Sequence, residues 1–590
     1  MCGIVGYIGK RQVLPILIKG LKRLEYRGYD SAGIAFFQNE DIILQKSVGR
    51  IQKLEKKLDY SLSSHVGIGH TRWATHGKVT TTNCHPHQVG NITIVHNGII
   101  ENDLEIKKEL ENNGYLFQSE TDTEVACALI DWIKKTHSSL KMVDVLNSAM
   151  KKLKGSYAIV VMVRGEQDKL YVMKKESPLV IGIGKEEYFV ASDFSAYLEE
   201  TKDYIILEDN EIGVLSMNNV SIYHNGILKD YVVKTLNEEV EISNKGNQEH
   251  YMMKEIKEQS NLIKKWNDLY FNKKEKLFDI TAYHHIHIVA CGTAYHAGLI
   301  GKYLFEKNTD FEVNVYVASE YRYQRNFLDK NTLVIAISQS GETADTLACV
   351  KMAKEKGATT LGIINVYNSS IARTVDAVIY THAGCEVAVA STKAYTSQVY
   401  ILGLLALEYQ NKREKKNTYQ ELPAKIDKLM EYDYSIIVKH LYQKKDIFYL
   451  GRNIDYVSML EGSLKLKEIT YIHSEAFPAG ELKHGPISLI EENTPVIALI
   501  THEETAPKTI SNIKEVKARG AYVVLIIKEG IIDSIDKNCY DEIIYLPKAD
   551  EYTSPILSVI PLQLIAYYTA KKKNLDIDKP RNLAKSVTVE

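Results

Sequence analysis

Cysteine is scarce in this chain of 590 residues, and its seven cysteines are scattered without a Cys-x-x-Cys pair. Sparse, unpaired thiols argue against a disulfide framework and against a structural zinc site, and they fit a reducing compartment. The chain also lacks a block of basic residues, and its formal net charge is −2. The charge pattern therefore predicts no nucleic-acid partner and no membrane partner.

Long hydrophobic runs are missing as well. The most apolar late stretch, residues 556–570, is interrupted by Ser558, Pro561 and Gln563, which argues against a membrane span. The first residues show no basic region followed by an apolar core, so we expect no signal peptide. Charged residues make up 25% of the chain, which is ordinary for a soluble globular protein, and we predict a cytoplasmic location.

Two strand patterns divide the chain. Up to about residue 240, short β-rich runs alternate with Gly turns and a few amphipathic helices, which predicts a mixed, largely antiparallel sheet domain. A polar stretch at 238–247 suits a linker, and a helix is expected from Glu249 to Leu269. From about residue 283, apolar strands are each followed by a Gly or Ser/Thr loop and a helix, which is typical of a parallel α/β sheet.

The parallel pattern occurs twice. The strands at His287 and Leu333 resemble those at Ile447 and Pro495, with an offset of about 160 residues, which indicates two copies of one α/β domain. We therefore expect a multidomain α/β chain. Its predicted parts are a first domain at 2–240, a linker and helix at 241–280, the two α/β copies at 281–435 and 436–572, and a tail at 573–590.

Cys2 is a candidate nucleophile. It directly follows Met1, and removal of Met1 would leave one residue with both a thiol and a free α-amino group. A thiol attacks as its thiolate, and an α-amino group that titrates near ~7.7–8.0 could take the thiol proton. A lone cysteine can also be a coincidence, so the case depends on polar clusters elsewhere in the first domain.

Three such clusters offer what an amide-hydrolysing cysteine needs. Arg72 could clamp a substrate carboxylate, Asp122 could accept from a substrate ammonium, and Asn97 with Gly98 could stabilise an oxyanion. Each has a structural alternative. The Asn-Gly pair is also a type I′ hairpin signal, residues 119–123 are typical of helix capping, and Arg72 could be an ordinary packed arginine.

Together these segments resemble the N-terminal-nucleophile (class II) glutamine amidotransferase domain. The matching segments are Met-Cys-Gly-Ile-Val-Gly from residue 1, Arg-Gly-Tyr-Asp-Ser-Ala-Gly from residue 27, His-Thr-Arg-Trp-Ala-Thr-His-Gly from residue 70 and His-Asn-Gly from residue 96. The resemblance implies an αββα fold that releases ammonia from glutamine through a γ-glutamyl thioester. It implies Cys2 as nucleophile with its own α-amino group as base, and Asn97 and Gly98 as the oxyanion hole. It also implies glutamine binding by Arg72, Thr75, His76 and Asp122, and an ammonia channel gated by Trp73.

In the second half, the loop Ser338-Gln339-Ser340-Gly341-Glu342-Thr343 follows a strand and precedes a helix. Backbone N–H groups and hydroxyls at a helix N-terminus can bind an anion, although such a loop is often only a helix cap. The nucleotide-binding pattern GxxxxGK[ST] is absent, so the expected ligand is a phosphate monoester. On a later helix, Glu461, Lys465 and Glu468 share one face, a spacing that usually marks a solvated ion-pair face.

The duplicated unit resembles the sugar isomerase (SIS) domain, a flavodoxin-like module that binds phosphosugars. The segment that supports this is Ser338–Thr343. An N-terminal-nucleophile glutaminase followed by two SIS domains resembles the family of enzymes that transfer ammonia from L-glutamine to D-fructose 6-phosphate and isomerise the product to D-glucosamine 6-phosphate. Four further segments support this resemblance of the whole chain: Cys385–Lys393, Leu464–Glu468, Glu481–Pro486 and Leu583–Glu590.

That resemblance implies a role for each matching residue. Glu468 would shuttle a proton between C1 and C2 with help from Lys465, and Lys585 would form the carbonyl adduct with the open-chain sugar. His484 would open the sugar ring, acting in the site of a partner subunit, which implies a homodimer. The residues implied in sugar-phosphate binding are Ser338, Gln339, Ser340, Thr343, Thr293, Val389 and Ser391. At Ala294 the family usually has Ser, a loss of one hydroxyl contact worth about 1 kcal/mol.

We expect no metal and no organic cofactor, because a ketose imine is acidic enough at C1 for a positioned carboxylate. Three alternatives stay open. The chain could aminate another ketose phosphate, or it could be a non-catalytic SIS sensor, in which Glu468, His484 and Lys585 would be superfluous. It could also be a self-processing N-terminal-nucleophile hydrolase, although that class normally matures from a longer propeptide.

Overall fold

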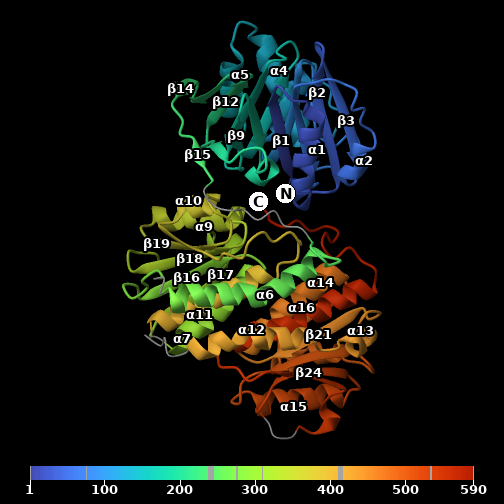
Figure 1. The fold of residues 1–590 in the computed structure, drawn as a ribbon, viewed down its shortest axis with the longest axis vertical. Coiled ribbons are helices and arrows are strands. Elements are labelled where there is room, and N and C mark those ends of the chain that lie inside the picture. Colours follow the sequence, from blue (N-terminus) through green and yellow to red (C-terminus); the bar gives the residue numbers. More distant parts are fainter. Residues whose placement is uncertain are drawn as a thin grey trace. The chain divides into compact units, whose positions relative to one another are not determined.

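The computed structural model describes residues 2–74, 76–236, 245–273, 277–308, 310–409, 416–531 and 535–588. Contacts divide the chain into two compact units, which we describe separately (Figure 1). Unit 1 comprises Met1–Glu239 and Ser586–Glu590, and unit 2 comprises Val240–Lys585. Met1 and the predicted boundary between residues 240 and 241 lie outside the described residues.

Unit 1 is built on two antiparallel sheets, as the alternation of short strands and Gly turns predicts. The first has the order β15-β11-β9-β10-β1-β4-β2-β3, and the second has the order β14-β13-β12-β8-β7-β6-β5. The strands of the first sheet are β1 (Gly3–Gly9), β2 (Ser31–Gln38), β3 (Asp41–Val48), β4 (Val66–Arg72), β9 (Val180–Gly184), β10 (Glu187–Ala191), β11 (Asp203–Ile206) and β15 (Lys234–Thr235). Those of the second are β5 (His87–Val89), β6 (Ile92–Ile100), β7 (Gly155–Val163), β8 (Lys169–Lys175), β12 (Glu211–Ser216), β13 (Val220–His224) and β14 (Ile227–Lys229).

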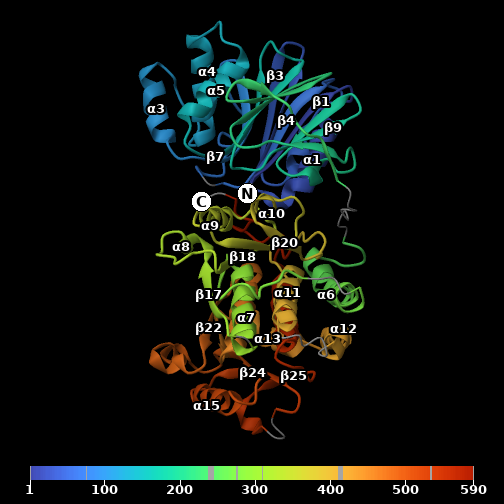
Figure 2. The same cartoon turned by 90° about the vertical axis from the view of Figure 1, so that its left-hand side faces the viewer.

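Helices cover both outer faces of this pair of sheets. They are α1 (Val13–Leu24) and α2 (Ile51–Glu55) on the first sheet, and α3 (Asp103–Asn112), α4 (Asp122–Thr136) and α5 (Met142–Lys152) on the second. Alternate residues of β1 face opposite ways: Ile4 and Ile8 pack between the sheets, and Val5 and Tyr7 pack beneath α1. Figure 2 shows α3, α4 and α5 along one side of the sheets. The αββα fold is confirmed.

Unit 2 contains two five-stranded parallel sheets with the same strand order. The first is β17-β16-β18-β19-β20 and the second is β22-β21-β23-β24-β25. Their strands are β16 (His285–Ala290), β17 (Glu312–Val317), β18 (Thr332–Ser338), β19 (Thr359–Ile364) and β20 (Ala377–Tyr380), then β21 (Asp446–Gly451), β22 (His473–Pro478), β23 (Pro495–Ile500), β24 (Tyr522–Lys528) and β25 (Glu542–Leu546). The strands predicted to correspond occupy equivalent places in the two sheets, so the duplication is confirmed.

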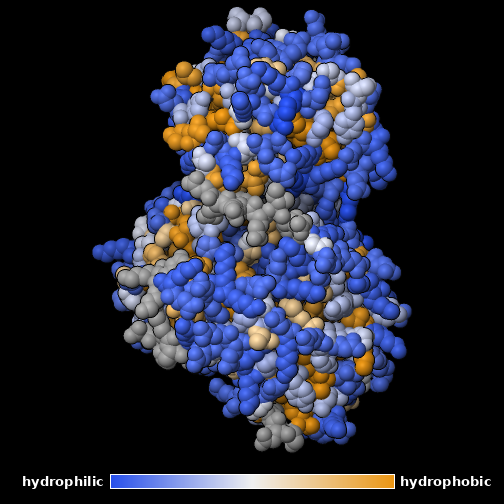
Figure 3. Space-filling view, in the orientation of Figure 1, coloured by the Kyte–Doolittle hydropathy of each residue, from blue (hydrophilic) through white to orange (hydrophobic). Residues whose placement is uncertain are grey.

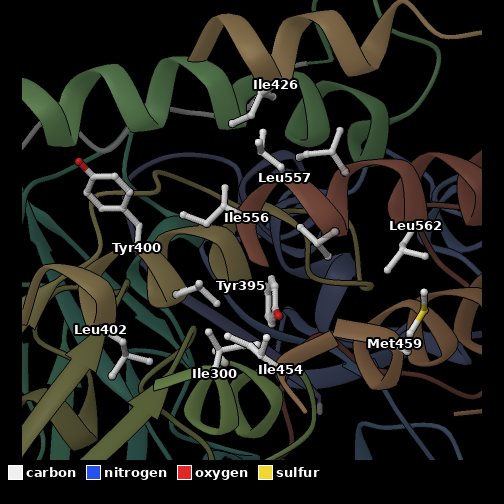
Figure 4. Close-up of a cluster of buried hydrophobic side chains, with 14 of the residues drawn as sticks. Ile300, Tyr395, Tyr400, Leu402, Ile426, Ile454, Met459, Ile556, Leu557 and Leu562 are labelled. Carbon is white, nitrogen blue, oxygen red and sulfur yellow. The ribbon is translucent and has the colours of Figure 1, made fainter. Parts of the chain in front are cut away.

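Seven helices of unit 2 share one hydrophobic core across both copies. They are α6 (Tyr251–Asn267), α7 (Thr293–Asn308), α11 (Lys393–Tyr409), α12 (Lys416–Met430), α13 (Ser435–Leu441), α14 (Ile454–Thr470) and α16 (Ser554–Lys572). The others pack in separate clusters: α8 (Ala318–Tyr321), α9 (Ala344–Glu355) and α10 (Ser370–Thr374) in the first copy, and α15 (Ala506–Lys517) in the second. In Figure 4, Ile300 and Tyr395 of the first copy lie in the same cluster as Met459 and Leu557 of the second.

The apolar helix α16 is buried in the core that both copies share. Its polar residues Ser558 and Gln563 are buried with it, and Ser558 Oγ donates back to the carbonyl of Ser554. The face of the molecule seen in Figure 3 is mainly hydrophilic. Among the described residues, no helix is both long enough and apolar enough to cross a membrane.

Candidate active sites

Strand pairing places Cys2 beside the residues that follow β4. Gly3 pairs with Thr71, so Cys2, which directly precedes β1, lies beside the end of β4 at Arg72 and Trp73. The Trp73 N–H donates to Cys2 Sγ at 3.2 Å, and Asn97 Nδ2 donates to the Cys2 carbonyl at 3.0 Å. Burial raises the pKa of the Cys2 thiol. The thiol therefore needs a nearby base before it can act as a nucleophile at neutral pH.

Asn97 and Gly98 lie inside β6, where they pair with Ala158 and Tyr157 of β7. The hairpin alternative is therefore wrong: the strand runs straight through the Asn-Gly pair to Ile100. Gly98 has φ +127°, and a Cβ there would lie 1.9 Å from the carbonyl oxygen of Ser156. Glycine is required here because a side chain would clash with β7, not because the chain turns.

His70 fixes the orientation of the Asn97 amide. Its Nε2 lies 3.0 Å from the carbonyl oxygen of His96 and 3.1 Å from Asn97 Oδ1. A carbonyl can only accept, so Nε2 carries the hydrogen and donates to both oxygens. Burial lowers the pKa of His70 to about 3, which keeps the ring neutral. With Oδ1 held by His70, the amide NH₂ of Asn97 faces Cys2.

Arg72 ends β4 and is buried, and its guanidinium donates to the carbonyls of His76, Gly77 and Lys78. Arg72 therefore also has the structural role of a packed arginine, because it binds the loop that follows it. Arg72 also lowers the pKa of the Cys2 thiol, which puts its charge within electrostatic reach of the sulfur. The half-buried His76 belongs to this loop. Thr75 lies outside the described residues.

Asp122 is the first residue of α4 and is buried, and its Oδ2 accepts from the Ile100 N–H at 2.9 Å. Its charge raises the pKa of the Cys2 thiol, so it too lies within electrostatic reach of Cys2. The capping alternative holds for the preceding residue, since Thr121 accepts from the Glu124 N–H. Of the predicted residues of unit 1, Cys2, Arg72, Trp73, Asn97 and Asp122 are gathered at one place.

The predicted phosphate loop of unit 2 joins the carboxyl end of β18 to α9. Ser338 Oγ accepts from the Gly341 N–H at 3.0 Å and lies 3.0 Å from Thr343 Oγ1. Ser340 Oγ accepts from the Glu342 N–H at 3.1 Å, and Gln339 is half-buried in the same loop. Gly341 has φ +64°, and a Cβ there would strike Ser369. The loop is therefore a tight turn lined by hydroxyls at the start of a helix.

The charged face of α14 is buried, so the expectation of a solvated ion-pair face is wrong. Lys465 Nζ lies 2.6 Å from Glu468 Oε2 and 3.5 Å from Glu461 Oε1, and its side chain is 1% exposed. It also donates to Thr293 Oγ1 at 3.0 Å. Burial opposes the charge of Lys465, but the carboxylates of Glu468 and Glu461 raise its pKa above the ordinary value. Burial raises the pKa of Glu468.

The C-terminal tail packs against α6 and against the loop that precedes α11. Asp578 is buried, and its carboxylate accepts from the Tyr251 and Met252 N–H groups at the start of α6. Its carbonyl accepts from the Val389 N–H at 3.0 Å. Further along, Lys585 Nζ donates to Glu386 Oε2 at 2.5 Å, to the Ala388 carbonyl at 2.8 Å and to Ser391 Oγ at 3.0 Å.

Electrostatics links Lys585 with the charged face of α14. The positive charge of Lys585 lowers the pKa of Glu468, and the negative charge of the Glu386 carboxylate raises the pKa of Lys465. The structure thus brings together Thr293, Ser391, Lys465, Glu468 and Lys585. His484 is exposed at the end of a short 3₁₀ helix, Glu481–His484, and no hydrogen bond or ion pair among the described residues joins it to this group.

Sequence reasoning missed three residues. His70 lies in a recognised segment but had no role, and its contact with Asn97 depends on the pairing of two sheets. Glu386 is a lone acid within the apolar run 383–390, and this pattern is the sequence signal that could have marked it as a buried residue with a partner. His296 on α7 bonds Glu461 at 2.8 Å, a contact between the two copies that no local pattern marks. The described residues contain no group of three or more side chains suited to hold a metal ion.

Comparison with known proteins covers the whole chain. Residues 77–199 match the glutamine amidotransferase domain, and residues 279–408 and 440–571 match the SIS domain. A protein of Clostridium tetani named glutamine–fructose-6-phosphate aminotransferase (isomerizing) is 48% identical over the full length of both chains. One of the same name from Caldanaerobacter subterraneus subsp. tengcongensis is 47% identical, again over the full length of both.

A solved structure gives the same relationship for the second half. The C-terminal domain of glucosamine-fructose-6-phosphate aminotransferase from Francisella tularensis superposes with a TM-score of 0.55 and 35% identity, covering 57% of this chain and all of that domain. At this identity, the likeness covers both sequence and fold.

Proposed function

Because this chain belongs to the family of isomerising glutamine–fructose-6-phosphate aminotransferases, we propose that each of its units carries one half of the reaction on the residues described above. The chain transfers the amide nitrogen of L-glutamine to D-fructose 6-phosphate and isomerises the product to D-glucosamine 6-phosphate. We assign glutamine hydrolysis to residues 2–240, sugar binding and isomerisation to the SIS copies at 281–435 and 436–572, and adduct formation to the tail at 573–590.

In the first half-reaction, Cys2 attacks the side-chain amide of glutamine after Met1 is removed. The freed α-amino group takes the thiol proton, so the thiolate can form although burial raises the pKa of the thiol. Asn97 Nδ2 and the Gly98 N–H stabilise the oxyanion, and the contact of Asn97 with Cys2 supports this role. Glutamine is held by the residues around this point: Arg72, Thr75, His76 and Asp122.

In the second half-reaction, Lys585 forms an adduct with the open-chain ketose, and ammonia displaces it at C2. Glu468, paired with Lys465, then moves a proton between C1 and C2. Residues Ser338, Gln339, Ser340 and Thr343 hold the phosphate, and Thr293, Val389 and Ser391 line the sugar. The observation that carries this half is the buried contact of a tail lysine, Lys585, with Ser391 and Glu386.

We further propose a cytoplasmic homodimer in which His484 opens the ring of a sugar bound to the other copy. Its exposed position, apart from Lys465, Glu468 and Lys585, suits that role. Trp73 is proposed to gate the passage of ammonia, and its N–H contact with Cys2 Sγ suits a gate at the point of release.

The division of labour is tested with Cys2→Ala in an assay for glucosamine 6-phosphate. Given glutamine, the variant should make no product, and given ammonium salt it should match the ammonia-dependent rate of the unaltered protein. Cys539→Ala removes a buried cysteine of the second SIS copy and serves as the matched control, active with both nitrogen sources. Failure of the Cys2 variant with both sources would refute the assignment.

A further inference from the structure

Lys585 is held as a fully bonded ammonium ion. Its three donor hydrogens match the three acceptors around it, which are Glu386 Oε2, the Ala388 carbonyl and Ser391 Oγ. Its side chain is 3% exposed, so water has little access to the nitrogen. An ammonium nitrogen has no lone pair, and it must lose a proton before it can attack a carbonyl carbon. The question is which group takes that proton.

Glu386 is placed to do so. Its side chain is fully buried, and Oε1 accepts from the Thr392 and Ala394 N–H groups at the start of α11, which leaves Oε2 directed at Lys585 Nζ. Among the described residues, it is the one carboxylate in hydrogen-bond contact with Nζ. The other charged groups facing the pair are Glu255 of α6, Lys393 of α11, and Lys465 and Glu468 of α14.

We propose that Glu386 is the acid–base catalyst of adduct formation at Lys585, an inference that rests on the proposed role of Lys585. Glu386 takes a proton from Nζ, the freed lone pair forms the Nζ–C2 bond, and the C2 carbonyl electrons move to its oxygen. Glu386 returns the proton to that oxygen, which gives a carbinolamine with a protonated nitrogen. It then takes a second proton from Nζ and delivers it to the hydroxyl, which leaves as water while the C2=Nζ iminium bond forms. Glu386 ends as a carboxylate, so it is regenerated.

The surroundings favour a carboxylic acid at Glu386 once the charge on Lys585 is gone. Burial by itself would raise the pKa of Glu386, but the ammonium of Lys585 lowers it to about 2. When the proton leaves Nζ, that attraction disappears, and burial is opposed only by the N–H groups of Thr392 and Ala394. Glu255 shows what such burial does in the same place, since burial and the charge of Glu386 raise its pKa to about 8.

Reduction of the iminium by cyanoborohydride tests the proposal. The unaltered protein, incubated with fructose 6-phosphate and the reductant, should carry a stable sugar adduct on Lys585 that peptide mass spectrometry locates. Glu386→Gln keeps a similar size and an acceptor oxygen but cannot shuttle protons, so trapping should slow at least about 100-fold, within the range known for general acid–base catalysis. Glu255→Gln is the matched control, because that buried carboxyl is already mostly neutral at pH 7, and its trapping rate should stay near that of the unaltered protein.

Binding of fructose 6-phosphate, followed by calorimetry, reports whether the Gln variant retains a folded site. If it does not bind, Glu386→Asp replaces it, and a restored carboxylate should recover part of the trapping rate. Two results would overturn the proposal: trapping by Glu386→Gln at the unaltered rate, or faster trapping with an optimum at lower pH. In either case Glu386 would only stabilise the ammonium form of Lys585 and would not transfer its protons. Absence of an adduct on the unaltered protein would instead overturn the proposed role of Lys585.

Discussion

In unit 1 the groups that hydrogen-bond Cys2 are neutral, although the charges of Arg72 and Asp122 also reach it, whereas in unit 2 Lys585 and Lys465 are bonded directly by buried carboxylates. In unit 1, Asn97 is oriented by a neutral histidine, His70, and the sulfur receives a backbone N–H. In unit 2, every contact between the catalytic lysines and an acidic side chain is an ion pair of nearly buried groups. The two sites use different means to control charge.

The difference follows from what each half-reaction must stabilise. Hydrolysis of an amide develops a brief negative charge on one oxygen, and fixed neutral donors stabilise it without attracting a permanent counter-ion. Isomerisation of a ketose moves protons between carbon, nitrogen and oxygen, so it needs acids and bases that change charge in place. A buried pair of an acid and a base can transfer such protons without rearrangement. Removing one partner of the pair leaves an uncompensated buried charge.

The largest expected effect concerns Glu468. Glu468→Gln removes the base but keeps the size of the side chain, so ammonia-dependent synthesis should fall by about 10²–10⁴-fold. Glutamine hydrolysis, measured as glutamate release, should persist. Glu475→Gln changes an exposed acid on the neighbouring β22 and is the control, with both rates kept. If Glu468→Gln synthesised product at the normal rate, the proton would have to move by another group.

The second-largest expected effect is a difference between the two units in how their stability depends on pH. Burial lowers the pKa of His70 to about 3 and lowers the pKa values of His85, His87 and His96 in the same cluster. Below pH 6.5 the unfolded chain takes up protons at these positions while the folded unit does not. Stability is therefore lost as pH falls from 6.5, by about 1 kcal/mol per histidine on reaching pH 5.5.

Unit 2 also has histidines with lowered pKa values, the buried His287 and the half-buried His382, but the effect of Glu255 on stability has the opposite sign. Its folded pKa of about 8 lies above the unfolded value, so it adds stability as pH falls from 8 toward 4.5. Hydrogen exchange corrected for intrinsic rates should show peptides of β4 and β6 losing more protection at pH 5.5 than peptides of β18. His87→Gln should reduce this slope, and the exposed His65→Gln should not. Equal slopes in both units would contradict the comparison.

A smaller effect is expected when the support of Asn97 is removed. His70→Ala frees the amide to turn, and because losing an oxyanion donor outright costs about 10²–10³-fold, a misaligned donor should lower the kcat for glutamine hydrolysis by about 10–100-fold. The KM for glutamine should change little, and His70→Gln, which can still donate, should recover part of the rate. Ammonia-dependent synthesis serves as the internal control. A raised KM with normal kcat would mean that His70 supports substrate binding instead.

The fold was open to prediction from the sequence because both units follow simple periodic patterns. Short strands with Gly turns predict unit 1, and two copies of the strand–loop–helix pattern predict unit 2. What the sequence could not give depends on pairing between distant segments. The Asn-Gly pair at 97–98 looks like a hairpin until β7 is paired with it, and the face of α14 looks solvated until α7 is packed against it.

The proposed site residues come mainly from the resemblance of whole segments, which does not include the residues that contact them. His70 contacts Asn97 and Glu386 contacts Lys585, which lie 27 and 199 positions away in the chain. No spacing of residues along the sequence predicts such a contact. A lone acid in an apolar run, as at Glu386, is the kind of signal that marks a buried partner before a structure exists.

The smallest predicted effect concerns Ala294, the position where the resemblance predicts a serine hydroxyl in the sugar site. The residue follows Thr293 at the start of α7, and Thr293 Oγ1 already bonds Lys465 and Glu461. Ala294→Ser would add one neutral hydrogen bond to the proposed sugar site, worth about 1 kcal/mol, so the KM for fructose 6-phosphate should fall about fivefold with kcat unchanged. Ala297→Ser, one turn on at a fully buried position, is the control that should give no gain. An unchanged KM for Ala294→Ser would mean that the new hydroxyl bonds the helix backbone and does not reach the sugar.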